Sequence, residues 1–135
     1  MQGRGATTEA AVMKAFLTLG HTVLVPFGHE VPYDLVVHDT GGAFWRVQCK
    51  TGRRRRGCVL FNSCSTDHGQ GRMSYIGRAD LFGVWCSPID RVFIVPVEEA
   101  AGFTTTLRLE PTRNAQARGI RFAERFAAER WRPST

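Results

Sequence analysis

The sequence predicts an α/β fold in which an N-terminal helix and a C-terminal helix flank a mixed β-sheet of mostly consecutive strands. Residues 8–19 and 119–131 carry apolar side chains at the spacing of an amphipathic helix. Between them the chain is divided into short runs rich in β-branched and aromatic residues, separated by turns that contain Gly, Pro or Asp. At 135 residues the chain is most simply one domain, which spans residues 1–135.

The charge of the chain favours a polyanionic partner. Its 18 basic residues outnumber its 12 acidic ones, which gives a net charge of +6 and a pI near 9.8. No apolar run approaches the roughly 20 residues of a membrane span, and the first residues contain no apolar core of a signal peptide. We therefore expect a cytoplasmic protein that does not bind a membrane and whose cysteines are reduced.

The first helix is expected over residues 8–19, with Thr7 or Thr8 as its cap. This start puts Glu9 in the first turn, where a carboxylate interacts favourably with the helix dipole. Glu9 also lies on the same helix face as the apolar Val12. Because a glutamate on an apolar face needs a partner, a functional role for Glu9 is favoured over the capping role.

A β-hairpin is expected from two strand-like runs, residues 33–38 and 44–50, on either side of a Thr-Gly-Gly turn. If that turn is a three-residue loop, Asp34 lies opposite Gln48. Strand side chains alternate between faces, so Lys50 shares a face with Gln48. An acid, an amide and a lysine then converge on one patch of sheet. The alternative to a functional site is a polar sheet edge in which Asp34 forms a salt bridge with Lys50.

A run of four arginines follows the hairpin directly. It is expected to leave the strand as a loop, and its position beside the polar patch favours phosphate binding over a merely solvated surface. The four residues are Arg53, Arg54, Arg55 and Arg56.

The other elements follow from turn residues and apolar runs. The Gly- and Ser-rich residues 63–74 are expected to form a mobile segment. Cys58, Cys64 and His68 do not have the spacing of a structural zinc site, so we expect no zinc. Further strands are expected over residues 21–26, 58–62, 79–86, 91–95 and 104–109, the last at an edge of the sheet.

The order of these residues resembles the PD-(D/E)xK nuclease superfamily, which has an acid on one strand, E/QxK on the next and often a further glutamate on an N-terminal helix. Here Asp34 is followed by Gln48-Cys49-Lys50, and Glu9 lies on the first helix. The resemblance implies a restriction-endonuclease-like core. The YDL and VQCKT segments are similar to small endonucleases of this superfamily that include a homing enzyme encoded in a group I intron.

The resemblance also implies roles for individual residues in a Mg²⁺-dependent endonuclease, with Mn²⁺ as a substitute metal. Asp34 is then the central metal ligand, Glu9 contributes directly or through water, and the backbone carbonyl of Cys49 is a further ligand. Lys50 orients or activates the attacking water and stabilises the charge that develops on the phosphate. Gln48 departs from the acidic form of the motif, and its uncharged amide is expected to weaken metal affinity and to disfavour a second ion nearby. This suggests one tightly held metal, or a second metal that binds only with DNA present.

The partner implied by the resemblance is double-stranded DNA. One active site per chain and two strands per duplex imply a homodimer or a dimer of dimers. Two alternatives remain. The chain could be similar to Holliday-junction resolvases, although these carry ExK where Gln48 stands, or it could be a non-catalytic DNA-binding module on a nuclease fold.

Overall fold

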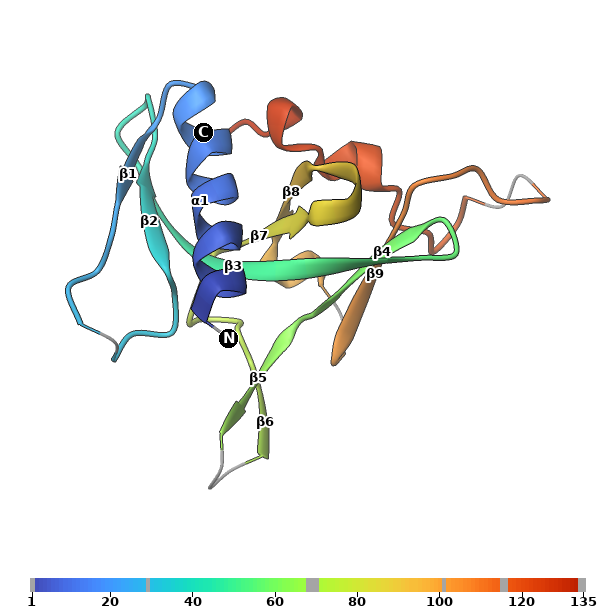
Figure 1. Ribbon diagram of the computed structural model, residues 1–135, viewed down its shortest axis with the longest axis horizontal. Helices are drawn as coiled ribbons and strands as arrows, with labels where there is room; N and C mark the ends of the chain where they lie inside the picture. The colour runs from blue at the N-terminus through green and yellow to red at the C-terminus, as the bar shows by residue number, and fades with distance from the viewer. Residues whose placement is uncertain (1, 29, 68–70, 101, 115–116, 134–135) are drawn as a thin grey trace.

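The computed structural model describes residues 2–28, 30–67, 71–100, 102–114 and 117–133, and α1 lies across a twisted sheet (Figure 1). Within these residues, the strand order of the main sheet is β1-β2-β3-β4-β9, with β7 on the other edge of β3 and β8 beside β7. The helix and strands are α1 (Gln2–Thr18), β1 (Thr22–Leu24), β2 (Leu35–His38), β3 (Phe44–Arg55), β4 (Cys58–Asn62), β5 (Cys64–Asp67), β6 (Gly71–Ser74), β7 (Leu81–Cys86), β8 (Arg91–Pro96) and β9 (Thr104–Arg108). Short 3₁₀ turns are η1 (Ser87–Ile89), η2 (Val97–Glu99), η3 (Ala123–Phe126) and η4 (Ala128–Arg130). No helix in the described part of the chain is long and apolar enough to span a membrane.

Helix α1 starts well before the predicted residue. Its first turn contains no acidic residue, so the predicted cap at Thr7 or Thr8 and the first-turn position of Glu9 are wrong. Two glycines near the start of α1 lower its helix propensity, which is why the sequence favours a later start. The side chain of Thr8 is almost fully buried, and its hydroxyl lies 2.7 Å from the hydroxyl of Thr51 on β3. Thr8 therefore joins the helix to the sheet.

The predicted hairpin of β2 and β3 is confirmed, including its register. Leu35 pairs with Val47 and His38 with Phe44, as a three-residue loop requires. The strand pairing ends at Leu35, and the N–H of Asp34 donates to the carbonyl of Val47 at 2.9 Å, so the register does not extend to the predicted pair of Asp34 and Gln48. The hairpin still places Asp34 beside β3, where its carboxylate accepts a hydrogen bond from the N–H of Cys49.

The loop of this hairpin is held by Asp39. Its carboxylate accepts hydrogen bonds from the backbone N–H groups of Gly41 and Ala43, at 2.8 and 3.0 Å, and from the indole of Trp45 at 2.7 Å. The Trp45 hydrogen bond is the main cause of a lowered pKa for Asp39, and the backbone donors add to it.

The basic run is not a loop, contrary to the prediction. β3 continues through Arg55 and pairs with β4, so that Arg53 lies opposite Leu60 and Arg55 opposite Cys58. The turn consists of Arg56 and Gly57, both with positive φ, at 49° and 75°. Two such residues are typical of the two-residue hairpin turn whose twist matches that of the strands. Pairing with β4, which lies at the predicted residues, extends the arginines into a rigid ribbon.

The Gly- and Ser-rich segment also differs from the prediction, because it forms a hairpin. β5 and β6 pair antiparallel, with Cys64 opposite Ser74, and they project from the main sheet as a two-stranded arm (Figure 1). His68 lies outside the described residues. Local propensity gave no strand here because serine and glycine favour turns.

The C-terminal segment is not the predicted helix over residues 119–131. It contains the turns η3 and η4, separated by Ala127 with an extended ψ of 134°. Tertiary pairing explains the difference, since Ala127 forms a β-bridge with Phe93 and Phe122 forms one with Arg108. The backbone groups of this segment therefore pair with strand edges instead of with one another. Trp131 then packs edge-on against Phe16 of α1, with ring centroids 5.4 Å apart.

Two apolar clusters lie on the two faces of the sheet. Val12 and Phe16 of α1 are fully buried against residues of β2, β3, β7 and β8, while a larger cluster that includes Phe82 and Phe93 covers the opposite face. Gly83 of β7 permits the close approach of α1, because a Cβ at this position would lie 2.5 Å from Cγ1 of Val12. The helix therefore lies against the centre of the sheet.

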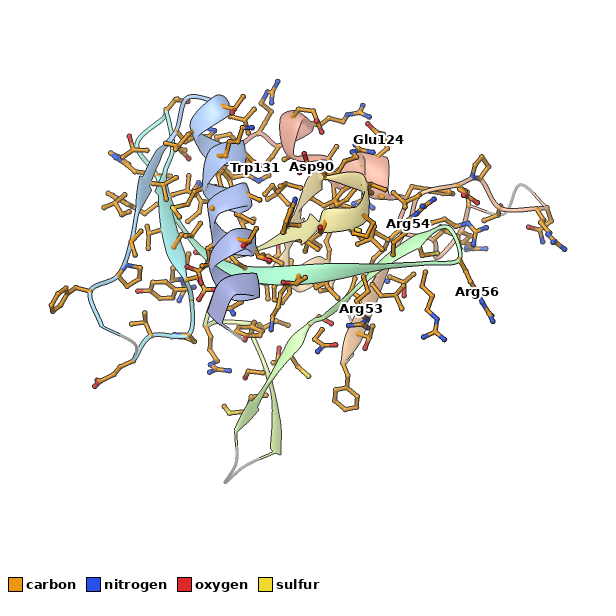
Figure 2. All side chains as sticks on the ribbon, viewed as in Figure 1. Arg53, Arg54, Arg56, Asp90, Glu124 and Trp131 are labelled. Atoms are coloured by element: carbon orange, nitrogen blue, oxygen red, sulfur yellow. The ribbon has the colours of Figure 1, made fainter. Side chains whose placement is uncertain are left out.

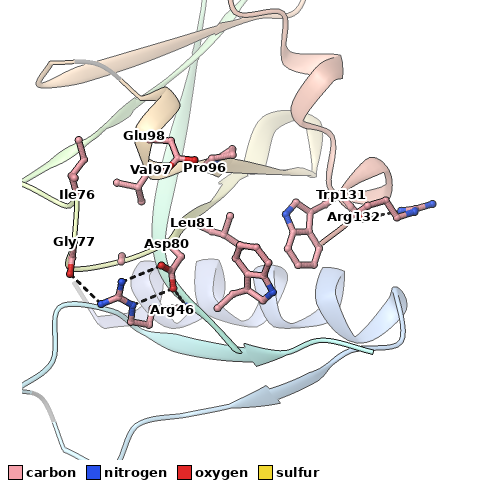
Figure 3. A pocket seen from close by; sticks show the side chains of 12 residues that line it. Arg46, Ile76, Gly77, Asp80, Leu81, Pro96, Val97, Glu98, Trp131 and Arg132 are labelled. Atoms are coloured by element: carbon pink, nitrogen blue, oxygen red, sulfur yellow. Dashed lines mark hydrogen bonds and ion pairs between the residues drawn. The ribbon is translucent and has the colours of Figure 1, made fainter. Parts of the chain in front are cut away.

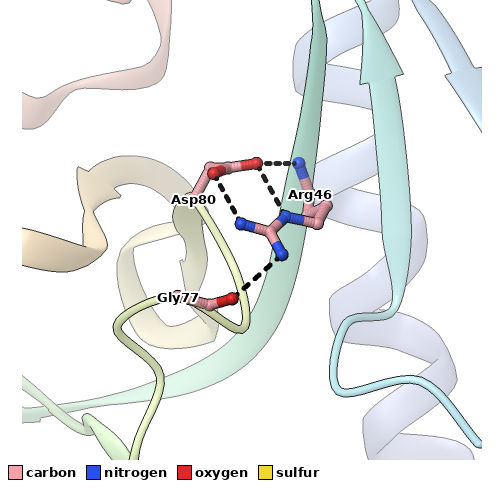
Figure 4. Close-up of polar contacts among 3 residues, drawn as sticks. All are labelled: Arg46, Gly77 and Asp80. Carbon is pink, nitrogen blue, oxygen red and sulfur yellow. Dashed lines mark hydrogen bonds and ion pairs between the residues drawn. The ribbon is translucent and has the colours of Figure 1, made fainter.

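A pair of charged residues fastens the start of β7 to β3. Asp80 accepts hydrogen bonds from the guanidinium of Arg46 at 3.0 and 3.1 Å and from its backbone N–H at 2.7 Å, and Arg46 also donates to the carbonyl of Gly77 (Figure 4). This clamp lies at one end of a pocket of about 350 Å³, with Trp131 at the other (Figure 3). β3 and β7 are parallel and far apart in sequence, so their pairing needs such a fixed starting point.

We predict that Asp80→Asn lowers the free energy of unfolding by about 1–2 kcal/mol at neutral pH, because it removes a charged acceptor of several hydrogen bonds that is partly exposed to solvent. Although burial opposes ionisation of Asp80, the Arg46 donors outweigh it and lower its pKa from the ordinary value of 3.8. The stabilisation that ionised Asp80 supplies is thus complete above the ordinary value and is lost as the pH falls through the lowered pKa. Urea unfolding of the wild type and the variant at several pH values measures this difference in stability.

The control is Asp90→Asn, since Asp90 is exposed, has a φ of 47° that asparagine tolerates, and accepts one hydrogen bond from Trp85. It should change stability by less than about 0.5 kcal/mol. Equal stability of Asp80→Asn and wild type at neutral pH would show that the clamp does not hold β7.

Candidate nuclease site

The candidate site lies where one edge of β3 has no neighbouring strand. That edge pairs with β2 up to Val47 and with β4 from Arg53 onward. The opposite edge pairs with β7 continuously from Val47 to Gly52. Within the described residues, the edge of β3 between β2 and β4 therefore has no strand partner, while its opposite edge is paired with β7. Gln48, Cys49 and Lys50 lie in or beside this open stretch.

Asp34 occupies the opening. Its backbone N–H donates to the carbonyl of Val47 at 2.9 Å, and its carboxylate accepts a hydrogen bond from the backbone N–H of Cys49 at 2.9 Å. The carboxylate thus replaces the strand partner that Cys49 lacks. The N–H and C=O of one strand residue point to the same edge, so the Cys49 carbonyl faces the same opening. The thiol of Cys49 packs with the apolar cluster beneath α1.

Glu9 approaches the opening from above, on α1. The bond between Thr8 and Thr51 sets the height of this part of the helix, because Thr51 directly follows Lys50 on β3. Burial raises the pKa of Glu9, and the negative charge of Asp34 raises it further. The two carboxylates are therefore close enough to repel each other.

Lys50 lies on the other side of Asp34. Its side chain is half-buried, and its Nζ lies 3.4 Å from the hydroxyl oxygen of Tyr75. Burial lowers the pKa of Lys50, and the charge of Asp34 opposes this shift. Burial raises the pKa of Asp34, while the Cys49 N–H and the charge of Lys50 act in the opposite direction. Asp34 is the common neighbour of Glu9, Cys49 and Lys50.

The arginines lie further along the same strand. At a rise of about 3.3 Å per residue, Arg56 is roughly 20 Å from Lys50. Arg53 and Arg54 lie on opposite sides of the ribbon, and Arg56 is at its tip (Figure 2). All four arginine side chains of the run are exposed. They therefore form a projecting basic arm, not part of the cluster around Asp34.

Comparison with known proteins identifies the family and the fold of the chain. A profile of the PD-(D/E)XK endonuclease family matches residues 1–129. The chain belongs to the PD-(D/E)XK endonuclease family. A solved structure of a bacterial homing endonuclease, I-Ssp6803I, has the same restriction-endonuclease-like fold, with a TM-score of 0.67 at 20% sequence identity, over 93% of this chain and 84% of that chain. No curated protein sequence matched the chain.

Members of the PD-(D/E)XK family typically use divalent metals, and the donors at the opening fit a hard cation. Two carboxylates that repel each other and a strand carbonyl that faces them are the oxygen ligands that Mg²⁺ favours. In the described ranges, no group of three or more His, Cys, Asp and Glu side chains is placed to hold a metal. Any ion at this opening would therefore depend on backbone or amide oxygens as well as on Glu9 and Asp34.

Gln48 is the residue by which this endonuclease departs from the acidic form of its motif. It precedes Cys49, and strand alternation puts its side chain on the same face of β3 as that of Lys50. An amide oxygen can bind a cation but carries no charge, so the site has one negative charge fewer than an ExK site.

Sequence reasoning missed the residues that surround Lys50 from the far side of the sheet. Tyr75, Ser65 and Arg78 come from β5 and from the chain after β6, and hydrogen bonds link them beside the lysine. Their sequence separation from Lys50 leaves no local pattern. The segment from Tyr75 to Asp80 is similar to the small endonucleases of the family, and this resemblance is the signal that points to it.

Proposed function

We propose that this PD-(D/E)XK endonuclease is a single-domain, Mg²⁺-dependent DNA endonuclease of the homing type, which hydrolyses phosphodiester bonds in duplex DNA. The observation that carries the proposal is Asp34 at the open edge of β3, with Glu9 on one side and Lys50 on the other. The structural likeness to a bacterial homing endonuclease supports the homing type.

Each residue of the opening has a role in this proposal. Asp34, Glu9 and the Cys49 carbonyl would hold one Mg²⁺, with the Gln48 amide as a weaker ligand. A bound cation supplies positive charge to a phosphate that becomes more negative as water attacks it. Lys50 orients that water and donates hydrogen bonds to the phosphate oxygens, while the charge of Asp34 attracts the ammonium group.

The basic arm formed by residues 53–56 is proposed to contact the DNA backbone. Arginine suits this role because its guanidinium matches phosphate geometry and stays charged. The arm begins three residues after Lys50 on the same strand, so a duplex at the opening would extend along it. Such contacts add affinity that does not depend on sequence.

We predict that the protein cuts duplex DNA in Mg²⁺, and in Mn²⁺ as a substitute, and that Asp34→Ala and Lys50→Ala each reduce the rate at least 100-fold. The substrates are a randomised duplex library and a four-way junction, and Asp90→Asn is the matched control that should cut normally. Equal cutting by wild type and Asp34→Ala would refute the site. Preferential cutting of the junction would favour a resolvase, and binding without cutting in any divalent metal would favour a non-catalytic module.

A second prediction concerns Arg56, whose positive φ of 49° is unfavourable for arginine. Asn-Gly is the preferred pair in this type of turn, so Arg56→Asn should raise the free energy of unfolding by about 0.5–1 kcal/mol. It should also weaken DNA binding and lower the slope of log K against log salt by about 1. Lys14→Gln, on the exposed face of α1, is the charge-matched control. Unchanged affinity in Arg56→Asn would exclude a phosphate contact.

A third prediction concerns assembly. Cutting both strands of a duplex with one site per chain requires two chains, so we propose a homodimer or a dimer of dimers. Sedimentation equilibrium should give two or four times the chain mass of 15.1 kDa. A mass of one chain, unchanged when DNA is added, would contradict this.

A further inference from the structure

The ammonium group of Lys50 has a neighbour that the proposed mechanism does not use. Its Nζ lies 3.4 Å from the hydroxyl oxygen of Tyr75 and 4.9 Å from the centre of the Tyr75 ring. A lysine side chain has a flexible four-carbon stem and many rotamers, so a lysine that must act at one point needs a contact that holds it. The charge of Asp34 attracts the ammonium but does not fix its direction.

Tyr75 itself is held rigidly. Its side chain is 5% exposed, and its ring packs edge-on against Phe82 with centroids 5.4 Å apart. Its backbone carbonyl accepts hydrogen bonds from the N–H groups of Arg78 and Ala79, at 2.8 and 3.0 Å. Both the ring and the backbone of Tyr75 are thus fixed before any ligand arrives.

Ser65 lies beside the Tyr75 hydroxyl group. Burial raises the pKa of Tyr75, and a hydrogen bond with Ser65 acts in the opposite direction. Ser65 donates to the carbonyl of Met73 at 3.4 Å and accepts from the guanidinium of Arg78 at 2.9 Å. The Tyr75 hydroxyl oxygen accepts the hydrogen bond that Lys50 donates.

Arg78 completes this arrangement from the other side. Its guanidinium carbon lies 5.5 Å from the centre of the Tyr75 ring, and its Nη1 also donates to the carbonyl of Ser74 at 3.3 Å. Lys50, Tyr75, Ser65 and Arg78 therefore form one cluster, in which Lys50 donates to Tyr75 and Arg78 donates to Ser65. It connects the β5–β6 hairpin to the opening in β3.

We propose that Tyr75 is a positioning residue of the nuclease reaction, which accepts a hydrogen bond from Lys50 and directs its ammonium group toward Asp34 and the reacting phosphate. The role of Tyr75 in catalysis rests on the proposed nuclease function. The contact between Tyr75 and Lys50 stands independently of it. Tyr75 acts through Lys50 and does not itself contact the reacting atoms.

The first experiment uses the fact that the chain has only two lysines, Lys14 and Lys50. In protein with ¹³C-labelled lysine, NMR relaxation of the Cε groups should show an ordered Lys50 and a mobile Lys14. Tyr75→Phe keeps the ring and removes the hydroxyl, and it should make Lys50 about as mobile as Lys14. Thr105→Val removes another buried hydroxyl, which donates to Ser63 at 2.9 Å, and should leave Lys50 unchanged.

The second experiment measures the effect of Tyr75 on the rate of DNA cleavage. In single-turnover cleavage, Tyr75→Phe should reduce the rate about tenfold while DNA affinity without metal stays at the wild-type value. A purely structural role would change stability or affinity instead, and Thr105→Val controls for that.

The outcomes separate the two proposals. A mobile Lys50 in the wild type, or an ordered Lys50 in Tyr75→Phe, overturns the positioning role whatever the activity. A wild-type rate in Tyr75→Phe also overturns it. If no DNA is cut by the wild type but Lys50 loses order in Tyr75→Phe, the proposed nuclease function fails while the contact is supported.

Discussion

The pairing of β3 is the constraint on which the structure depends. One edge of this strand is held continuously by β7, and the Arg46–Asp80 clamp fixes where that pairing begins. The other edge is divided between β2 and β4, which part at the level of Cys49. An open strand edge ordinarily costs stability and invites aggregation, because its backbone groups lack partners. Here the Asp34 carboxylate accepts the hydrogen bond of the Cys49 N–H, which has no strand partner. Charged side chains therefore gather at the open edge.

The same opening explains why the site combines residues with opposed electrostatic needs. Burial destabilises Glu9 and Asp34 as anions, and the charge of Asp34 destabilises the Glu9 anion further. Burial destabilises Lys50 as a cation. Such a cluster is unfavourable for folding alone, and a bound cation would relieve the repulsion between the carboxylates. The apolar clusters on both faces of the sheet, with Val12 packed over Gly83, provide the rigid support that a strained polar site needs.

The sequence predicted the local parts of this structure and not the long-range ones. The register of the first hairpin follows from its three-residue loop and is correct from Leu35 to His38, but Asp34 bonds to Val47 and does not extend the register to Gln48. The bounds of α1 were wrong because its glycines favour a later start. The C-terminal helix was wrong because pairing with β8 and β9 outweighs an apolar spacing that favours a helix. The contact of Tyr75 with Lys50 joins residues 25 apart in the sequence. It depends on the β5–β6 hairpin, which local propensity did not predict.

The central claim is that the opening in β3 binds a catalytic metal through Glu9 and Asp34. The most direct test is a Mn²⁺ titration followed by electron paramagnetic resonance, with wild type, Glu9→Gln and Asp34→Asn, in the absence of DNA. We expect one tightly bound ion per chain in the wild type and affinity at least tenfold lower in each variant, since each removes a charged ligand. Equal binding by all three proteins, or no bound ion in the wild type, would contradict the account.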